Sequence, residues 1–297
     1  MNNLLKRALS GTVYVALIVG TCLFSTLGFG ILMLAFGVIG IYEFHNVTSD
    51  RKASITTRCG ILSLDIIGVM SLLLLALASR LVIGSAGFAA PEGMMYVGMF
   101  CSLLVLYVMA RVGFSLFQRS GNPTAMLSHS ALGVIYLSVG LGSAIVLDEM
   151  SNGLALLIFI FIWLNDTGAY LSGMMFGRHK LCVHLSPKKT WEGFFGGLLI
   201  CIAAGVVFSL TGFGAYLMLL IPWMSSLTML GFILPISVVL FSTCGDLFES
   251  MIKRNYGVKD SGNIIPGHGG VLDRIDSMLF AMPGTALIIV LYVMVAF

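Results

Sequence analysis

The chain has 297 residues, of which 58% are hydrophobic and only 10% charged, and its formal net charge is +3. Ordinary soluble domains contain about 25% charged residues, so this composition excludes a water-soluble fold. A membrane-spanning helix needs about 20 mostly apolar residues, so the chain has room for about eight to ten spans and none for a separate soluble domain. The six cysteines are scattered without a metal-binding or disulfide pattern, and we interpret them as small packing residues.

Apolar runs bounded by polar residues, glycine or proline predict an all-α, polytopic membrane protein with about nine transmembrane helices. The predicted spans are residues 8–25, 28–44, 59–79, 95–115, 130–147, 154–175, 191–212, 227–250 and 277–296. The first follows a short basic segment, as in a signal peptide, but it lacks a clear small-residue cleavage site, so we expect it to be retained. The run from Gly214 to Trp223 is short and contains Pro222, which favours a re-entrant or interfacial segment.

The distribution of basic residues predicts the orientation of these spans. Short cytoplasmic loops collect lysine and arginine. With a cytoplasmic N-terminus, all but Arg80 and Arg111 of the 16 basic residues fall in cytoplasmic segments. We therefore expect the N-terminus inside and the C-terminus outside.

The two halves of the sequence differ in polarity. Residues 1–150 contain about five spans joined by short polar loops, whereas residues 151–297 also carry two dense polar motifs. We therefore divide the chain into an N-terminal transmembrane region, 1–150, and a C-terminal transmembrane region, 151–297, that holds the chemistry.

The first polar motif covers residues 163–193. Asp166 lies inside an apolar span, where an ionised group costs about 2.5–3.5 kcal/mol, so it indicates either a polar site or a structural ion pair. Lys188 and Lys189 lie between Ser186 and Thr190 at the entry to the next span. Two adjacent ammonium groups at a helix N-terminus are suited to a phosphate, although anchoring to anionic lipid would favour the same residues.

The second polar motif covers residues 244–276. Asp246, Glu249 and Lys253 are spaced i, i+3, i+7 and share one helical face, and Asp273 and Asp276 are again three residues apart. Carboxylates from two helices could hold a hard cation such as Mg²⁺. A solvated acidic face at the membrane interface is the alternative interpretation.

A glycine-rich segment, 266–270, separates the two acidic faces. Glycine imposes no side-chain bulk, so this segment can bring backbone amides close to a ligand. Its His268 has no second histidine or cysteine at ligand spacing, which argues against zinc.

At these residues the sequence resembles the phosphatidate cytidylyltransferases, also called CDP-diacylglycerol synthases. The family pattern S-x-x-K-R, four residues, K-D-x-G, P-G-H-G-G and D-R-x-D appears without a broken position at 250–254, 259–262, 266–270 and 273–276. The upstream pattern D-x-x-A-Y, G-R and S-P-K-K-T-x-E-G appears at 166–170, 177–178 and 186–193. The motifs cover roughly residues 163–283, and the first half matches only as apolar spans.

The resemblance implies an enzyme that converts phosphatidic acid and CTP to CDP-diacylglycerol and pyrophosphate. It implies Asp246 and Asp273 as the metal-holding pair, with Mg²⁺ and a second cation such as K⁺. The candidate catalytic residues are these two aspartates together with Lys188, Lys189, Lys253, Arg254, Arg274 and Asp276. The candidate substrate-binding residues are Asp166, Ser186, Thr190, Lys259, Asp260, Gly267, His268, Gly269 and Gly270.

Three alternatives stay open at this point: a CTP-dependent lipid kinase, a transporter with Asp65 and Asp166 as a cation relay, and an inactive scaffold. The expected partners are CTP, phosphatidic acid and the lipid bilayer. A homodimer is left open, and no nucleic acid is expected. We expect a bacterial inner membrane location with the active site facing the cytoplasm.

Overall fold

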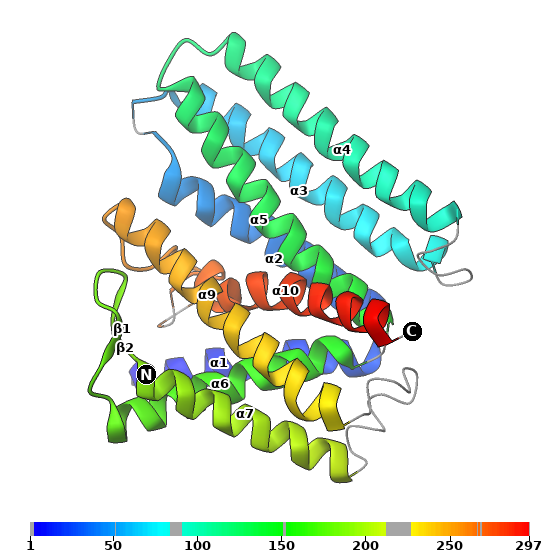
Figure 1. Ribbon diagram of the computed structural model, residues 1–297. Helices are drawn as coiled ribbons and strands as arrows, with labels where there is room; N and C mark the ends of the chain where they lie inside the picture. The colour runs from blue at the N-terminus through cyan, green and yellow to red at the C-terminus, as the bar shows by residue number, and fades with distance from the viewer. Residues whose placement is uncertain are drawn as a thin grey trace. The chain divides into compact units, whose positions relative to one another are not determined.

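The computed structural model describes residues 3–50, 52–83, 91–150, 153–211, 227–265, 267 and 269–296 (Figure 1). Its helices are α1 (Asn3–Phe24), α2 (Thr26–Thr48), α3 (Ile55–Ile83), α4 (Pro91–Leu116), α5 (Pro123–Met150), α6 (Leu154–Phe176), α7 (Trp191–Thr211), the π-helix η2 (Met229–Ile233), α9 (Leu234–Asn255) and α10 (Leu272–Ala296). Within the described ranges, the only strands are β1 (Lys180–Cys182) and β2 (Ser186–Thr190), which form one antiparallel hairpin. The predicted all-α fold is confirmed.

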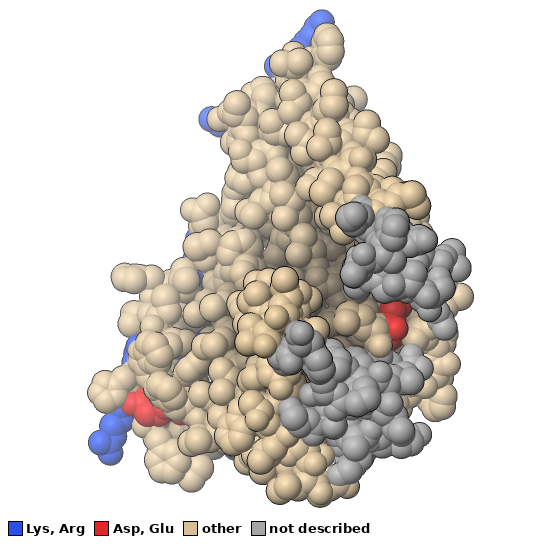
Figure 2. Space-filling model, turned by 45° about the vertical axis from the view of Figure 1, so that its right-hand side comes forward, with Lys and Arg blue, Asp and Glu red and all other residues tan. Residues whose placement is uncertain are grey.

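Eight helical segments of the described chain are long and apolar enough to cross a membrane. They are Thr26–Thr48, Ile55–Ser79, Met95–Leu116, Pro123–Met150, Leu154–Phe176, Trp191–Thr211, Met229–Asn255 and Leu272–Val295. The first predicted span corresponds to α1, which contains a shorter apolar stretch, Leu9–Phe24. On the face shown in Figure 2, charged side chains are few and uncharged residues make up most of the surface. The protein is therefore an integral membrane protein. Its orientation stays a prediction. The re-entrant or interfacial segment predicted from Gly214 to Trp223 lies outside the described residues.

Helix α5 starts seven residues before the predicted span because its first turns are polar. Asn122 caps it: its side-chain oxygen accepts hydrogen bonds from the Ala125 amide at 3.2 Å and the Thr124 hydroxyl at 2.8 Å. Pro123 follows at the first helical position, where its missing N–H costs nothing. Apolar content alone thus locates the membrane-embedded part of a helix rather than its end.

The chain forms two compact units, each made of separate segments. The first unit contains Met1–Leu17, Leu27–Val146 and Asp260–Arg274, and the second contains Ile18–Thr26, Leu147–Lys259 and Ile275–Phe297. The predicted division at residue 150 concerned motifs rather than packing, and it stays a prediction.

The first unit has a buried polar network among its transmembrane helices. Asp65 on α3 accepts hydrogen bonds from the Tyr107 hydroxyl at 2.9 Å and the Ser130 hydroxyl at 2.8 Å. The guanidinium of Arg111, which is fully buried, has its Nε 3.8 Å from Asp65 and donates to Ser130 and Ser115. The buried Asp65 carboxylate is thereby paired with two hydroxyls and a nearby cation, as a buried charge requires.

The second unit depends on close approach of helices α6 and α7. A Cβ on Gly168 of α6 would lie 3.0 Å from the Cα of Gly197 of α7, and one on Gly193 would lie 2.8 Å from the Ala169 carbonyl oxygen. Small residues at a helix interface allow such backbone contact in membranes, where dispersion replaces the hydrophobic effect as the main attraction. The polar motif around Asp166 is thereby held against the start of α7.

Candidate functional site

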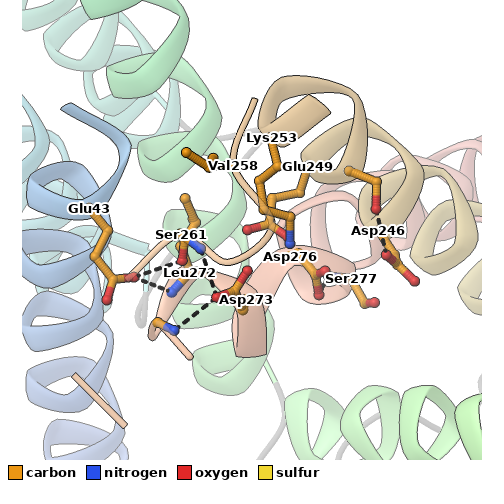
Figure 3. A network of polar contacts seen from close by, with 12 residues as sticks. Glu43, Asp246, Glu249, Lys253, Val258, Ser261, Leu272, Asp273, Asp276 and Ser277 are labelled. Atoms are coloured by element: carbon orange, nitrogen blue, oxygen red, sulfur yellow. Dashed lines mark hydrogen bonds and ion pairs between the residues drawn. The ribbon is translucent and has the colours of Figure 1, made fainter. Parts of the chain in front are cut away.

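In the first unit, the glycine-rich loop before α10 folds around the carboxylate of Asp273. The Asp273 Oδ2 atom accepts hydrogen bonds from the amides of Ser261 at 2.9 Å and Gly270 at 2.8 Å (Figure 3). Gly267 and Gly269 have φ values of 80° and 93°, which favour glycine, and a Cβ on Gly269 would lie 2.7 Å from that same oxygen. Residues that the sequence assigned to phosphate and metal binding therefore also shape the loop.

Sequence reasoning missed Glu43, which lies in the same part of the first unit. This α2 residue is 1% exposed and accepts hydrogen bonds from the Ser261 hydroxyl and from the amides of Val271 and Leu272. The available signal was an acidic residue within the apolar run 28–44, the same signal that singled out Asp166.

In the second unit, α9 presents the acidic and basic face that its spacing predicted. Lys253 donates to Glu249 at 2.6 Å, and the Ser250 hydroxyl donates to Asp246 at 3.4 Å. Asp276 of α10 lies beside Glu249 and Lys253 (Figure 3). Because Lys253 is in the last turn of α9, its charge also interacts favourably with the carbonyl end of the helix dipole.

The hairpin between α6 and α7 brings a cation to this face. Lys189 forms an ion pair with Asp246, and the two side chains are 29% and 31% exposed. The hairpin is closed at its base by His179, whose Nδ1 lies 2.6 Å from Glu192 Oε1 and whose carbonyl accepts from the Trp191 amide. Thr190 caps α7, since its Oγ1 accepts from the Gly193 amide at 3.1 Å.

A cavity of about 360 Å³ opens within the second unit between α6, the hairpin, α7 and α9. Its volume is in the range of small-molecule sites. It combines two lysines, one aspartate and several hydroxyl or amide groups with apolar side chains, so it suits a ligand with both charged and apolar parts. Its lining residues are Asn165, Asp166, Ala169, Tyr170, Gly173, Met174, Leu181, Lys188, Lys189, Thr190, Gly193, Phe194 and Thr243.

The cavity brings together four predicted site residues, Asp166, Lys188, Lys189 and Thr190, and the ion pair joins Asp246 to them. Among the other predicted site residues, Arg254, Lys259, Asp260 and Arg274 are exposed and Ser186 lies in β2. His268 lies outside the described residues. Asp246 and Asp273 belong to different units, so their shared metal site stays a prediction.

The chemistry of the acidic residues fits a hard divalent cation. Asp246, Asp273 and Asp276 offer carboxylate oxygens, which Mg²⁺ prefers, and Mg²⁺ commonly uses one or two carboxylates with substrate phosphates and water. Within the described ranges, no group of three or more histidine, cysteine, aspartate or glutamate side chains is placed to hold a metal ion.

Comparison with known proteins identifies the family. The model of the cytidylyltransferase family matches residues 5–292. A phosphatidate cytidylyltransferase of Bacillus subtilis is 31% identical over 289 residues, which cover 95% of this chain and 96% of that protein. The chain belongs to the cytidylyltransferase family, and the resemblance drawn from its motifs is confirmed.

Staphylococcal relatives match a shorter part of the chain more strongly. Phosphatidate cytidylyltransferases of Staphylococcus saprophyticus and of Staphylococcus aureus strain COL are 43% and 45% identical over 147 residues. These matches cover 49% of this chain and 53% of each relative, so the chain spans about half the length of these relatives. The comparisons support neither the lipid kinase nor the transporter.

Proposed function

We propose that this protein transfers CMP from CTP to phosphatidic acid, giving CDP-diacylglycerol and pyrophosphate. The observation that carries the proposal is the cavity of the second unit, in which Lys188 and Lys189 line a partly apolar space and Lys189 is paired with Asp246. The family membership and the names of the relatives support the same reaction.

The reaction brings two anions together. A lipid phosphate has a second pKa of about 6, so near neutral pH its oxygen can attack the α-phosphorus of CTP without a strong base. A new phosphorus–oxygen bond forms as the bond to the β-phosphate oxygen breaks, so CMP joins the lipid and pyrophosphate leaves. The ammonium groups of Lys188 and Lys189 offset the charge of these phosphates.

The carboxylates have two roles in this proposal. Asp246 and Asp273 are the residues that would hold Mg²⁺, with a second cation such as K⁺, and a bound metal would stabilise the departing pyrophosphate. Asp246 also orients the Lys189 ammonium through their ion pair. The Lys189 side chain lines the cavity, so it can bind a substrate phosphate while staying next to the carboxylate.

Assembly and location complete the proposal. We place the enzyme in a bacterial inner membrane with its N-terminus and active site on the cytoplasmic side, where CTP is made. We also keep the homodimer as the assembly to test, by mass measurement of the detergent-solubilised protein.

The test is product analysis with purified protein, phosphatidic acid, Mg²⁺ and CTP labelled separately at the α- and γ-phosphates. We expect α-label in the lipid fraction and γ-label in pyrophosphate, and loss of both in Asp246→Asn. Asp50→Asn is the matched control, because Asp50 is a half-buried residue of the first unit whose carboxylate accepts hydrogen bonds from the Lys52 and Asn122 amides and does not line the cavity. Transfer of γ-label to lipid would instead support a kinase, and no labelled lipid with any lipid phosphate would overturn the proposal.

A further inference from the structure

We propose that Glu43 is a positioning residue for the reaction: its carboxylate holds the loop segments 260–265 and 269–272 in the arrangement that presents Asp273. This inference rests on the proposed function, because Asp273 matters only if the loop belongs to the catalytic site. Glu43, the loop and Asp273 all belong to the first unit.

The carboxylate of Glu43 binds both ends of the loop. Near its beginning, the Ser261 hydroxyl donates to Oε2 at 3.2 Å (Figure 3). At its end, the amides of Val271 and Leu272 donate to Oε1 at 3.1 Å and to Oε2 at 2.8 Å. These two amides stand at the start of α10, where backbone N–H groups have no partner within the helix. Glu43 thus caps α10 from a distance of 228 residues in the sequence.

Two glycines of the signature leave room for this carboxylate. A Cβ on Gly262 would lie 2.5 Å from Glu43 Oε1, and one on Gly270 would lie 2.4 Å from Oε2. Neither distance is compatible with a real side chain, so any larger residue at these positions would displace the carboxylate. The glycines are therefore required by Glu43 as well as by the backbone of the loop.

Residues of the loop connect Glu43 to Asp273 through hydrogen bonds. Ser261 bonds to Glu43 through its hydroxyl and to Asp273 through its amide. Gly270, next to Val271, donates its amide to the same Asp273 oxygen, Oδ2. Since the same short segments contact both carboxylates, displacement of Glu43 must move the amides that orient Asp273.

Asp65 provides a matched comparison for a purely structural role. Asp65 and Glu43 are both 1% exposed, and both belong to the first unit. The Asp65 carboxylate accepts hydrogen bonds from Tyr107 on α4 and Ser130 on α5, whereas Glu43 accepts them from the loop. Asp65→Asn should therefore weaken the fold without a selective effect on the loop.

The experiment compares Glu43→Gln with Asp65→Asn in the purified full-length protein. Glutamine has the same shape but places an NH₂ group against backbone N–H donors. We expect kcat for CDP-lipid formation to fall about 10- to 100-fold and the Mg²⁺ concentration for half-maximal rate to rise, as when a residue that orients a metal ligand is lost. KM for phosphatidic acid should change by less than about threefold. Glu43→Asp, which keeps both oxygens, should recover part of the rate.

Hydrogen exchange supplies a readout that does not depend on activity. In Glu43→Gln, peptides covering 260–274 should exchange faster while peptides from the rest of α2 keep their protection. In Asp65→Asn, any loss of protection should fall on α3, α4 and α5. The proposal is overturned if Glu43→Gln keeps wild-type kinetics and loop protection, or if its losses spread over the whole unit as in Asp65→Asn.

A milder variant covers the case in which Glu43→Gln does not fold. Ser261→Ala removes only the hydroxyl contact and keeps the amide bond to Asp273. It should change kcat and loop exchange in the same direction by about two- to fivefold, as expected for one neutral hydrogen bond, and no change in either would overturn the proposal. If the wild-type protein makes no CDP-lipid, the proposed function fails, while the exchange data still decide whether Glu43 holds the loop.

Discussion

Replacing Lys189 with methionine should remove most of the activity while leaving the fold nearly as stable. The Lys189 and Asp246 side chains are 29% and 31% exposed, and ion pairs of such exposure contribute only about 0–1 kcal/mol to stability. In contrast, loss of one group that stabilises developing charge in a closed site lowers kcat by about 10²- to 10³-fold, which corresponds to about 2.7–4 kcal/mol. The expected effect on the transition state therefore exceeds the effect on folding by at least a factor of about two.

The assay measures the initial rate of CDP-lipid formation at saturating CTP and the Tm of the same detergent preparation. Lys188→Met is the matched control, because Lys188 lines the same cavity but is more exposed than Lys189. We expect Lys188→Met to act mainly on KM for CTP. The reasoning is refuted if Lys189→Met keeps kcat within about threefold of wild type. It is also refuted if the Tm of Lys189→Met falls by more than the loss of about 1 kcal/mol of stability explains.

Three other predictions follow from the structure. Arg111→Met should destabilise the protein by about 3–5 kcal/mol, because it leaves the buried Asp65 carboxylate without its cation. Denaturant unfolding in detergent should show that the double variant Arg111→Met/Asp65→Asn is more stable than Arg111→Met alone. Chelation of divalent cations should abolish CDP-lipid formation, and added Mg²⁺ but not Ca²⁺ should restore it, because Ca²⁺ prefers more ligands at longer distances; recovery with no divalent cation would contradict the metal assignment. Hydrogen bonds from the amides of Lys52 and Asn122 lower the pKa of Asp50, so its contribution to stability is present above the ordinary aspartate pKa of about 3.9 and is lost as pH falls below it. Thermal unfolding of Asp50→Asn should accordingly differ from wild type at pH 6 and converge with it in acid, and a constant difference would exclude this linkage.

Two features of the site show which contacts local sequence can predict and which it cannot. Asp246, Glu249 and Lys253 are predicted to share a face because their spacing follows the helical period, and the helix around them is regular. The pairing of Asp246 with Lys189 could not be predicted, because it depends on a hairpin that lies between two helices and on how that hairpin packs. The strands are only three and five residues long, too short for an alternating apolar pattern to identify them.

The sequence by itself determined that the protein is a polytopic helical membrane protein and which segments carry its chemistry, because hydropathy and motif spacing are local properties of the chain. Tertiary structure decided which side chains meet. Glu43 and the start of α10 are more than 200 residues apart in the sequence, and only the folding of α2 against the loop brings that carboxylate to the amides of Val271 and Leu272. Unpaired amides at a helix start need an acceptor, but nothing in the local sequence specifies which distant residue supplies it.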